Sequence, residues 1–138
     1  MARKESVMLT KINHIGIAVH SIEEAVPFYR DSLGMALKGT EEVPSQKVRV
    51  AFLSIGESKI ELLEPTAPDS PVAKFLEKNG PGVHHVAYGV PDVAEAIAKL
   101  KASGTRMIDD VPREGAHGAR IAFIHPKSSG GVLTEICG

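Results

Sequence analysis

Two histidines and two glutamates recur at matching positions in two similar stretches of the chain. INHIGIAV, which contains His14, is answered by VHHVAYGV, which contains His85, at 85 − 14 = 71 residues. KIELLE, which contains Glu61, is answered by LTEICG, which contains Glu135, at 135 − 61 = 74 residues. Each copy of this repeat therefore supplies one imidazole and one carboxylate, and a repeat usually fixes the architecture that positions such groups.

These four side chains form a mixed nitrogen–oxygen donor set. Such a set suits a borderline divalent ion better than Ca²⁺ or Mg²⁺. Co²⁺, Ni²⁺, Mn²⁺, Fe²⁺ and Zn²⁺ are ions of this kind, and the donor set does not choose among them. An inward-facing pair of carboxylates also requires a compensating cation, because burying unpaired charge is costly. The sequence therefore predicts one divalent transition-metal ion, bound by His14, Glu61, His85 and Glu135.

The residues around these positions predict two modules of the order β-α-β-β-β. Each begins with a short strand rich in β-branched residues. A helix follows in each module and opens with a capping box, Ser21 with Glu24 in the first and Asp92 with Glu95 in the second. Pro27 lies inside the first helix and should kink it, because proline lacks a backbone donor.

Three strand-like segments follow each helix, and a proline-rich joint links the modules. The strands are expected at about Met35–Glu41, Lys47–Ile55 and Ser58–Glu64, then at about Thr105–Asp109, Ala119–His125 and Val132–Cys137. The joint, 65–82, should contain a short helix at Val72–Lys78. We expect an α+β fold in which two tandem βαβββ modules, about 10–64 and 83–138, form one curved eight-stranded sheet. This incomplete barrel around the metal site would be a single domain, 1–138.

Alternation along a strand places both candidate histidines on a face of small residues. His14 and His85 each share their face with a small residue two positions on and another four positions on. His84 has the opposite phase and is assigned to the structural side. Glu64, next to a proline, is interpreted as a surface residue at a strand end. A single histidine in a strand is usually a core or rim residue. Two histidines in equivalent phase, each matched to a glutamate, instead favour a role as metal ligands.

Composition narrows the class of protein. The 138 residues are 43% hydrophobic and 24% charged with a net charge of −1, which gives no electrostatic reason to expect nucleic acid or a membrane surface as partner. The single cysteine, Cys137, suits a reducing cytoplasm and is expected as a half-buried thiol at a strand end. The start, MARKESVML, has no apolar core and is expected to be a short disordered arm rather than a signal peptide.

Long stretches of the chain resemble one superfamily. They are INHIGIAV, SKIELLEPTAPDSPVAKFLEKNGPGVHHVA, GAHGARIAF and HPKSSGGVLTE. They resemble the vicinal-oxygen-chelate superfamily (glyoxalase, bleomycin-resistance and dioxygenase proteins), and within it the methylmalonyl-CoA epimerases. The resemblance implies the same four metal ligands and a homodimer. The implied reaction interconverts (R)- and (S)-methylmalonyl-CoA by removing and returning the proton next to the thioester, with a metal-stabilised enolate between. The family often has glutamine at the position of Glu61.

The resemblance leaves the proton-transfer groups open. Some of these epimerases carry a glutamate, taken as the catalytic base, where Val50 stands, and valine cannot move a proton. Glu135 is therefore a candidate base as well as a ligand. His117, in the GAHGA loop, is the candidate for the opposite face of the substrate, and a surface-loop histidine is the alternative. The candidate substrate-binding residues are Gln46, the repeat counterpart of His117, and Lys127 and Ser128 in the glycine-rich loop before the last strand.

Two other functions fit the same fold. A glyoxalase-I-type lyase resembles this chain in ligand set and would act on a glutathione hemithioacetal. A metal-free protein that sequesters a small molecule would share the fold but would not need all four ligands.

Overall fold

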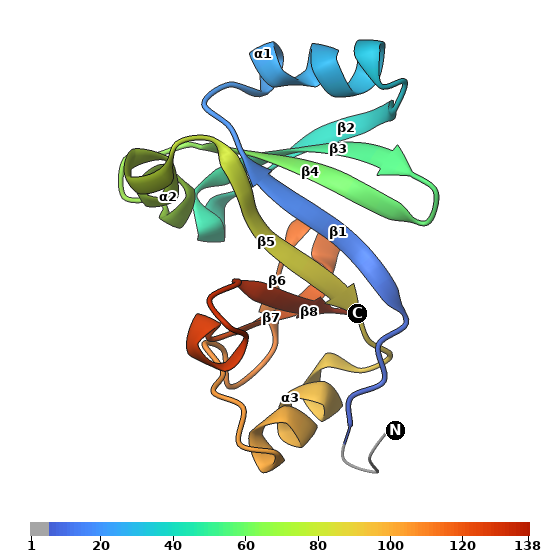
Figure 1. The fold of residues 1–138 in the computed structure, drawn as a ribbon, viewed down its shortest axis with the longest axis vertical. Coiled ribbons are helices and arrows are strands. Elements are labelled where there is room, and N and C mark those ends of the chain that lie inside the picture. Colours follow the sequence, from blue (N-terminus) through green and yellow to red (C-terminus); the bar gives the residue numbers. More distant parts are fainter. Residues whose placement is uncertain (1–5) are drawn as a thin grey trace. The chain divides into compact units, whose positions relative to one another are not determined.

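The computed structural model describes residues 6–138, which fold into two compact units (Figure 1). The first unit is His14–His84, and the second combines residues 6–13 with His85–Gly138. Each unit contains a βαβββ arrangement, so the two predicted modules are confirmed. No helix in the described part of the chain is long and apolar enough to span a membrane.

The first unit is built on the strand order β2-β3-β4-β1. Its elements are β1 (Lys11–Ala18), α1 (Ile22–Pro27), β2 (Ala36–Val43), β3 (Val48–Ile55), β4 (Ser58–Pro65) and α2 (Pro71–Asn79). β1 runs parallel to β4, and β3 is antiparallel to both of its neighbours. α1 buries Ile22 and Val26 against Ala51, Leu53 and Leu62 of the sheet. This packing covers one face of the sheet, and Glu61 and Phe52 alternate with these residues and lie on the other face.

The second unit has the strand order β5-β8-β7-β6. Its elements are β5 (Gly82–Gly89, which starts at the end of the first unit), α3 (Val93–Ala102), β6 (Arg113–Glu114), β7 (Arg120–Ile124) and β8 (Thr134–Cys137). β8 is parallel to β5 and antiparallel to β7. α3 packs Val93, Ala96 and Ile97 against Ile124 and Ile136.

The predicted helix N-caps agree with the structure. The Ser21 hydroxyl accepts the Glu24 N–H at 3.2 Å, and the Asp92 carboxylate accepts the Glu95 N–H at 2.9 Å. At Pro27 the α-helix ends and a π-helical turn, Phe28–Ser32, continues it. Because proline lacks a backbone N–H, it interrupts the regular hydrogen bonds of an α-helix. A change of helix type at this residue is therefore expected.

Two expectations need correction. The strand predicted at Thr105–Asp109 is reduced to an isolated bridge between Met107 and Ile124, and the edge strand is instead Arg113–Glu114. The Asp109 carboxylate accepts the Phe123 N–H at 2.8 Å, so a side chain takes the place of a backbone partner. Cys137, expected to be half-buried, is buried. The predicted N-terminal arm consists mainly of residues 1–5, which lie outside the described residues.

Candidate functional site

The first unit holds a buried imidazole–carboxylate pair on two parallel strands. Gly16 of β1 lies opposite Glu61 of β4, and His14, two residues earlier on β1, shares the face of Gly16. The distance from His14 Nδ1 to Glu61 Oε2 is 3.2 Å. The residues are 6% and 7% exposed. A glycine opposite the carboxylate leaves room for the imidazole.

The second unit repeats this arrangement. Ala87 of β5 lies opposite Glu135 of β8, and His85 precedes Ala87 by two residues. The distance from His85 Nε2 to Glu135 Oε1 is 3.3 Å. The residues are 5% and 4% exposed. Both predicted pairs therefore form, each within its own unit.

The geometry of each pair fits shared binding of a metal ion. Two atoms that bind one ion at about 2.1 Å, with an angle of about 90–110° between them, lie about 3.0–3.4 Å apart. The nitrogen–oxygen distances of 3.2 and 3.3 Å fall in this range. Imidazole and carboxylate donors also match the ligands of borderline divalent ions. The residues present therefore fit the ion that the donor set predicts.

Two residues set aside from the ligand set have structural partners. The His84 ring lies edge-on to Phe75 of α2, with centroids 5.1 Å apart, as its strand phase predicts. Glu64 is more than a surface residue, because its Oε1 accepts the Ile22 N–H at 2.7 Å. A carboxylate at the N-terminus of a helix satisfies a free N–H and interacts favourably with the helix dipole. Glu64 thus joins β4 to the start of α1.

The candidate proton donor His117 lies in a tight turn just before β7. The turn is Ala116–Gly118, and His117 is exposed with a left-handed backbone, φ 57° and ψ 29°. Its repeat counterpart Gln46 ends a similar turn before β3, followed by Lys47 at φ 52°. This conformation is energetically unfavourable for a non-glycine residue. Residues held in it are more frequent at functional sites than elsewhere. Val50, where a base would be expected, is buried and apolar.

The candidate substrate-binding residues Lys127 and Ser128 share an exposed turn between β7 and β8. The Lys127 N–H donates to His125 Nδ1 at 3.1 Å, and the Ser128 Oγ accepts the Arg106 N–H at 2.8 Å. Loss of hydration, together with the positive charges of Arg106 and Lys127, lowers the pKa of His125. The turn is therefore tied to Arg106 by a hydrogen bond and is positively charged.

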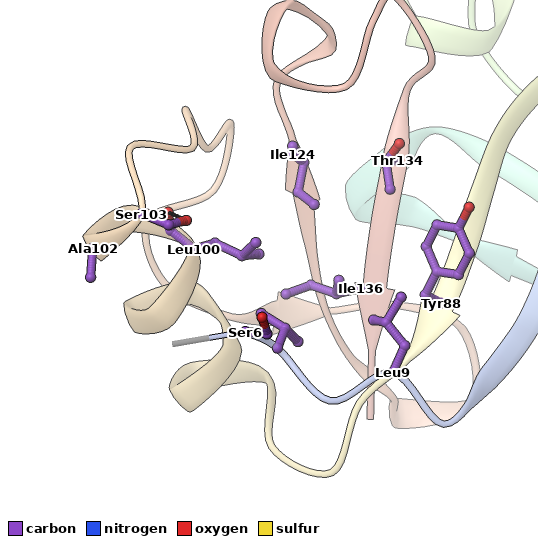
Figure 2. A pocket seen from close by; sticks show the side chains of 10 residues that line it. Ser6, Leu9, Tyr88, Leu100, Ala102, Ser103, Ile124, Thr134 and Ile136 are labelled. Carbon is purple, nitrogen blue, oxygen red and sulfur yellow. Dashed lines mark hydrogen bonds between the residues drawn. The ribbon is translucent and has the colours of Figure 1, made fainter. Parts of the chain in front are cut away.

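A pocket in the second unit, of about 620 Å³, lies on the other side of the sheet. Figure 2 shows Tyr88, Thr134 and Ile136 lining it beside α3. These residues alternate along β5 and β8 with Ala87 and Glu135, so they point to the opposite face from the ligand pair. This pocket is consequently not part of the candidate site.

Sequence reasoning did not identify Phe123 as a neighbour of the site. Phe123 lies opposite Glu135 in the β7–β8 register, as Phe52 lies opposite Glu61 in the β3–β4 register. The available signal was the repeat of VRVAFL as ARIAFI, which places the two phenylalanines at the same point. Without the register between strands, that signal did not connect either ring to a ligand.

Known proteins resemble the chain over nearly its whole length. Residues 13–123 match the family described as the Glyoxalase/Bleomycin resistance protein/Dioxygenase superfamily. The ethylmalonyl-CoA/methylmalonyl-CoA epimerase of Cereibacter sphaeroides is 40% identical, over 94% of this chain and 98% of that protein. A solved methylmalonyl-CoA epimerase in complex with methylmalonyl-CoA and NH₄⁺ is 47% identical with a TM-score of 0.91, over 94% of each chain. A Streptomyces coelicolor methylmalonyl-CoA epimerase variant in complex with 2-nitronate-propionyl-CoA gives the same values.

Proposed function

Because the chain belongs to the glyoxalase/bleomycin resistance/dioxygenase superfamily, we propose that it is a metal-dependent epimerase that interconverts (R)- and (S)-methylmalonyl-CoA. The observation that carries the proposal is the pair of buried imidazole–carboxylate sets, His14 with Glu61 and His85 with Glu135, at equivalent positions of the two units. The similarity to epimerases at 40–47% identity supports the substrate.

These four residues would hold one divalent ion, Co²⁺ in the first place. When bound, the ion supplies Lewis-acid stabilisation of the negative charge that develops on the thioester oxygen as C2 loses its proton. The nitronate ligand of the similar Streptomyces coelicolor protein supports this route. A nitronate is planar and negatively charged next to the thioester, so it has the shape and charge of a deprotonated substrate.

Two residues of the chain would move the proton. The Glu135 carboxylate accepts the proton as the C2–H bond breaks, and the imidazolium of His117 donates a proton to the opposite face of C2. The roles exchange in the reverse direction. His117 is exposed, so its proton equilibrates with water and one epimer acquires a solvent hydrogen. The strained backbone of His117 supports a functional role for this turn.

The polar residues of the neighbouring turns would bind the rest of the substrate. Lys127 is an exposed cation suited to the phosphates of the CoA arm. The Ser128 oxygen already accepts a backbone N–H, so its hydroxyl hydrogen is the group it can offer to a substrate oxygen. Gln46 would hydrogen-bond the substrate from the first unit. By family resemblance we expect a homodimer, and the single cysteine of the chain suits a cytoplasmic location.

The test is incorporation of deuterium from D₂O into C2 of methylmalonyl-CoA. The metal-loaded protein should catalyse exchange and bind about one ion per chain, and chelation should abolish exchange until Co²⁺ is restored. His85→Ala should abolish both metal binding and exchange, whereas His84→Ala should retain both. Exchange that survived His85→Ala would exclude the metal route. Activity on the methylglyoxal–glutathione hemithioacetal instead of methylmalonyl-CoA would favour the glyoxalase-type lyase.

A further inference from the structure

The ring of His85 contacts an aromatic side chain that is itself held by charged groups. Phe123 of β7 lies 5.6 Å from His85 between ring centroids, with the rings at 81°. Phe123 is 7% exposed. Edge-to-face contacts of this kind are specific in geometry as well as apolar. Since Phe123 also lies opposite Glu135 in the strand register, it adjoins both members of the ligand pair.

The side chain of Phe123 is covered from outside by a cation. The guanidinium carbon of Arg113 lies 5.2 Å from the centre of the Phe123 ring, within the range of a cation–π interaction. Arg113 Nε is 3.3 Å from Asp109 Oδ2, and this ion pair is partly shielded because the Asp109 side chain is 16% exposed. Arg113 is thereby fixed over the ring.

The backbone of Phe123 is held by the same segment. Its N–H donates to Asp109 Oδ2 at 2.8 Å, and its carbonyl accepts the Ile108 N–H at 2.9 Å. One oxygen of Asp109 thus binds both the backbone of Phe123 and the cation that covers its ring. The sequence predicts a regular strand at this edge. In its place, the Asp109 carboxylate bonds to the backbone of Phe123 and to the side chain of Arg113.

We propose that Asp109, Arg113 and Phe123 are positioning residues that fix the orientation of the His85 ring, so that Nε2 always faces Glu135. His85 shares its face of β5 with Ala87 and Gly89, so the Phe123 ring is a bulky group that can limit rotation of the imidazole beside its ion pair with Glu135. Residues around metal ligands that fix ring orientation typically change metal affinity or activity about 10- to 100-fold when mutated. The catalytic consequence rests on the proposed function, but the ring orientation does not.

The chain contains a matched control for this contact. Phe75 makes the same edge-on contact with His84, at 5.1 Å and 75°. His84 has the opposite strand phase and is outside the proposed ligand set. Removing each phenylalanine therefore deletes the same kind of contact from two neighbouring histidines with different assigned roles.

The direct test is NMR of the imidazole nitrogens in metal-free protein. In the wild type, His85 should show a single tautomer, protonated at Nε2, with narrow lines. Phe123→Leu should give exchange-broadened or averaged His85 signals. The conservative variant Phe123→Tyr, which keeps the aromatic ring, should show the wild-type pattern. Arg113→Met and Asp109→Asn should produce the same change to a smaller extent. Phe75→Leu should leave His85 unchanged.

Metal affinity provides the second readout. Phe123→Leu should weaken Co²⁺ binding about 10- to 100-fold and alter the visible spectrum of the Co²⁺ complex, whereas Phe75→Leu should change neither. If Phe123→Leu, Arg113→Met and Asp109→Asn lower the melting temperature but leave the His85 signals as in the wild type, the three residues are only structural and the inference is overturned. If Phe123→Leu does not fold, the Arg113 and Asp109 variants decide alone. If these variants alter the His85 signals but the metal-loaded wild-type protein has no epimerase activity, the proposed function is refuted and this inference is kept.

Discussion

The two units carry the same imidazole–carboxylate pair at the same register, yet they surround it differently. His14 faces Glu61 through Nδ1 at 3.2 Å, and His85 faces Glu135 through Nε2 at 3.3 Å. In both units the glutamate lies opposite a small residue two positions after the histidine. The two halves of the repeat are therefore most alike at the two parallel strands that place each imidazole beside its carboxylate.

The edges of the two units have diverged. β2 pairs with β3 through seven residue pairs, whereas β6 pairs with β7 through two. Glu41 lies opposite Val50 in the first unit, and Arg113 lies opposite Ile121 in the second. The charge at this position is therefore reversed, and in the second unit the guanidinium of Arg113 covers Phe123. The comparison teaches that two equivalent imidazole–carboxylate pairs can have different surroundings.

The largest expected difference between the units is between their glutamates. Glu135→Gln should lower kcat by about 10³-fold, because it removes the proposed base together with a charged ligand. Glu61→Gln should lower kcat by about tenfold or less, since the family often has glutamine there and an amide oxygen can still bind the ion. Steady-state kinetics with metal analysis of both variants checks this. Equal losses of kcat in the two variants at matched metal content would mean that Glu135 has no role beyond binding the metal ion.

The second difference concerns the turns before the central strands. His117→Ala should slow epimerisation about 10²-fold while one epimer still exchanges its C2 proton with D₂O, because only one face loses its proton donor. Gln46→Ala should instead raise KM a few-fold with little change in kcat. Exchange measured separately from each epimer distinguishes the two. Unchanged rates from both epimers in His117→Ala would remove His117 from the proposal.

The smallest expected difference is in helix capping. Asp92→Ala should lower the free energy of unfolding by about 1 kcal/mol, a typical loss for an N-cap. Ser21→Ala should lower it by about 0.5 kcal/mol, because Glu64 also accepts an N–H at the start of α1. Urea unfolding of the two variants measures both values. A larger loss for Ser21→Ala would show that Glu64 does not share the capping of α1.

The sequence by itself determined the two modules, the helix caps and the four candidate ligands. These follow from local rules: alternation along a strand separates His85 from His84, and a capping residue lies three positions before its partner. The repeat then extends each local inference to the other half of the chain.

Tertiary structure decided the surroundings of the ligands. Glu64 reaches Ile22 across 42 residues, and Asp109 reaches Phe123 across 14. The contact of Phe123 with His85 depends on the register of β7 against β8 and of β8 against β5. No periodicity in the sequence specifies such partners, because they are brought together by strand pairing and loop closure. The sequence thus names the groups that can bind a metal, and the fold decides what holds them in place.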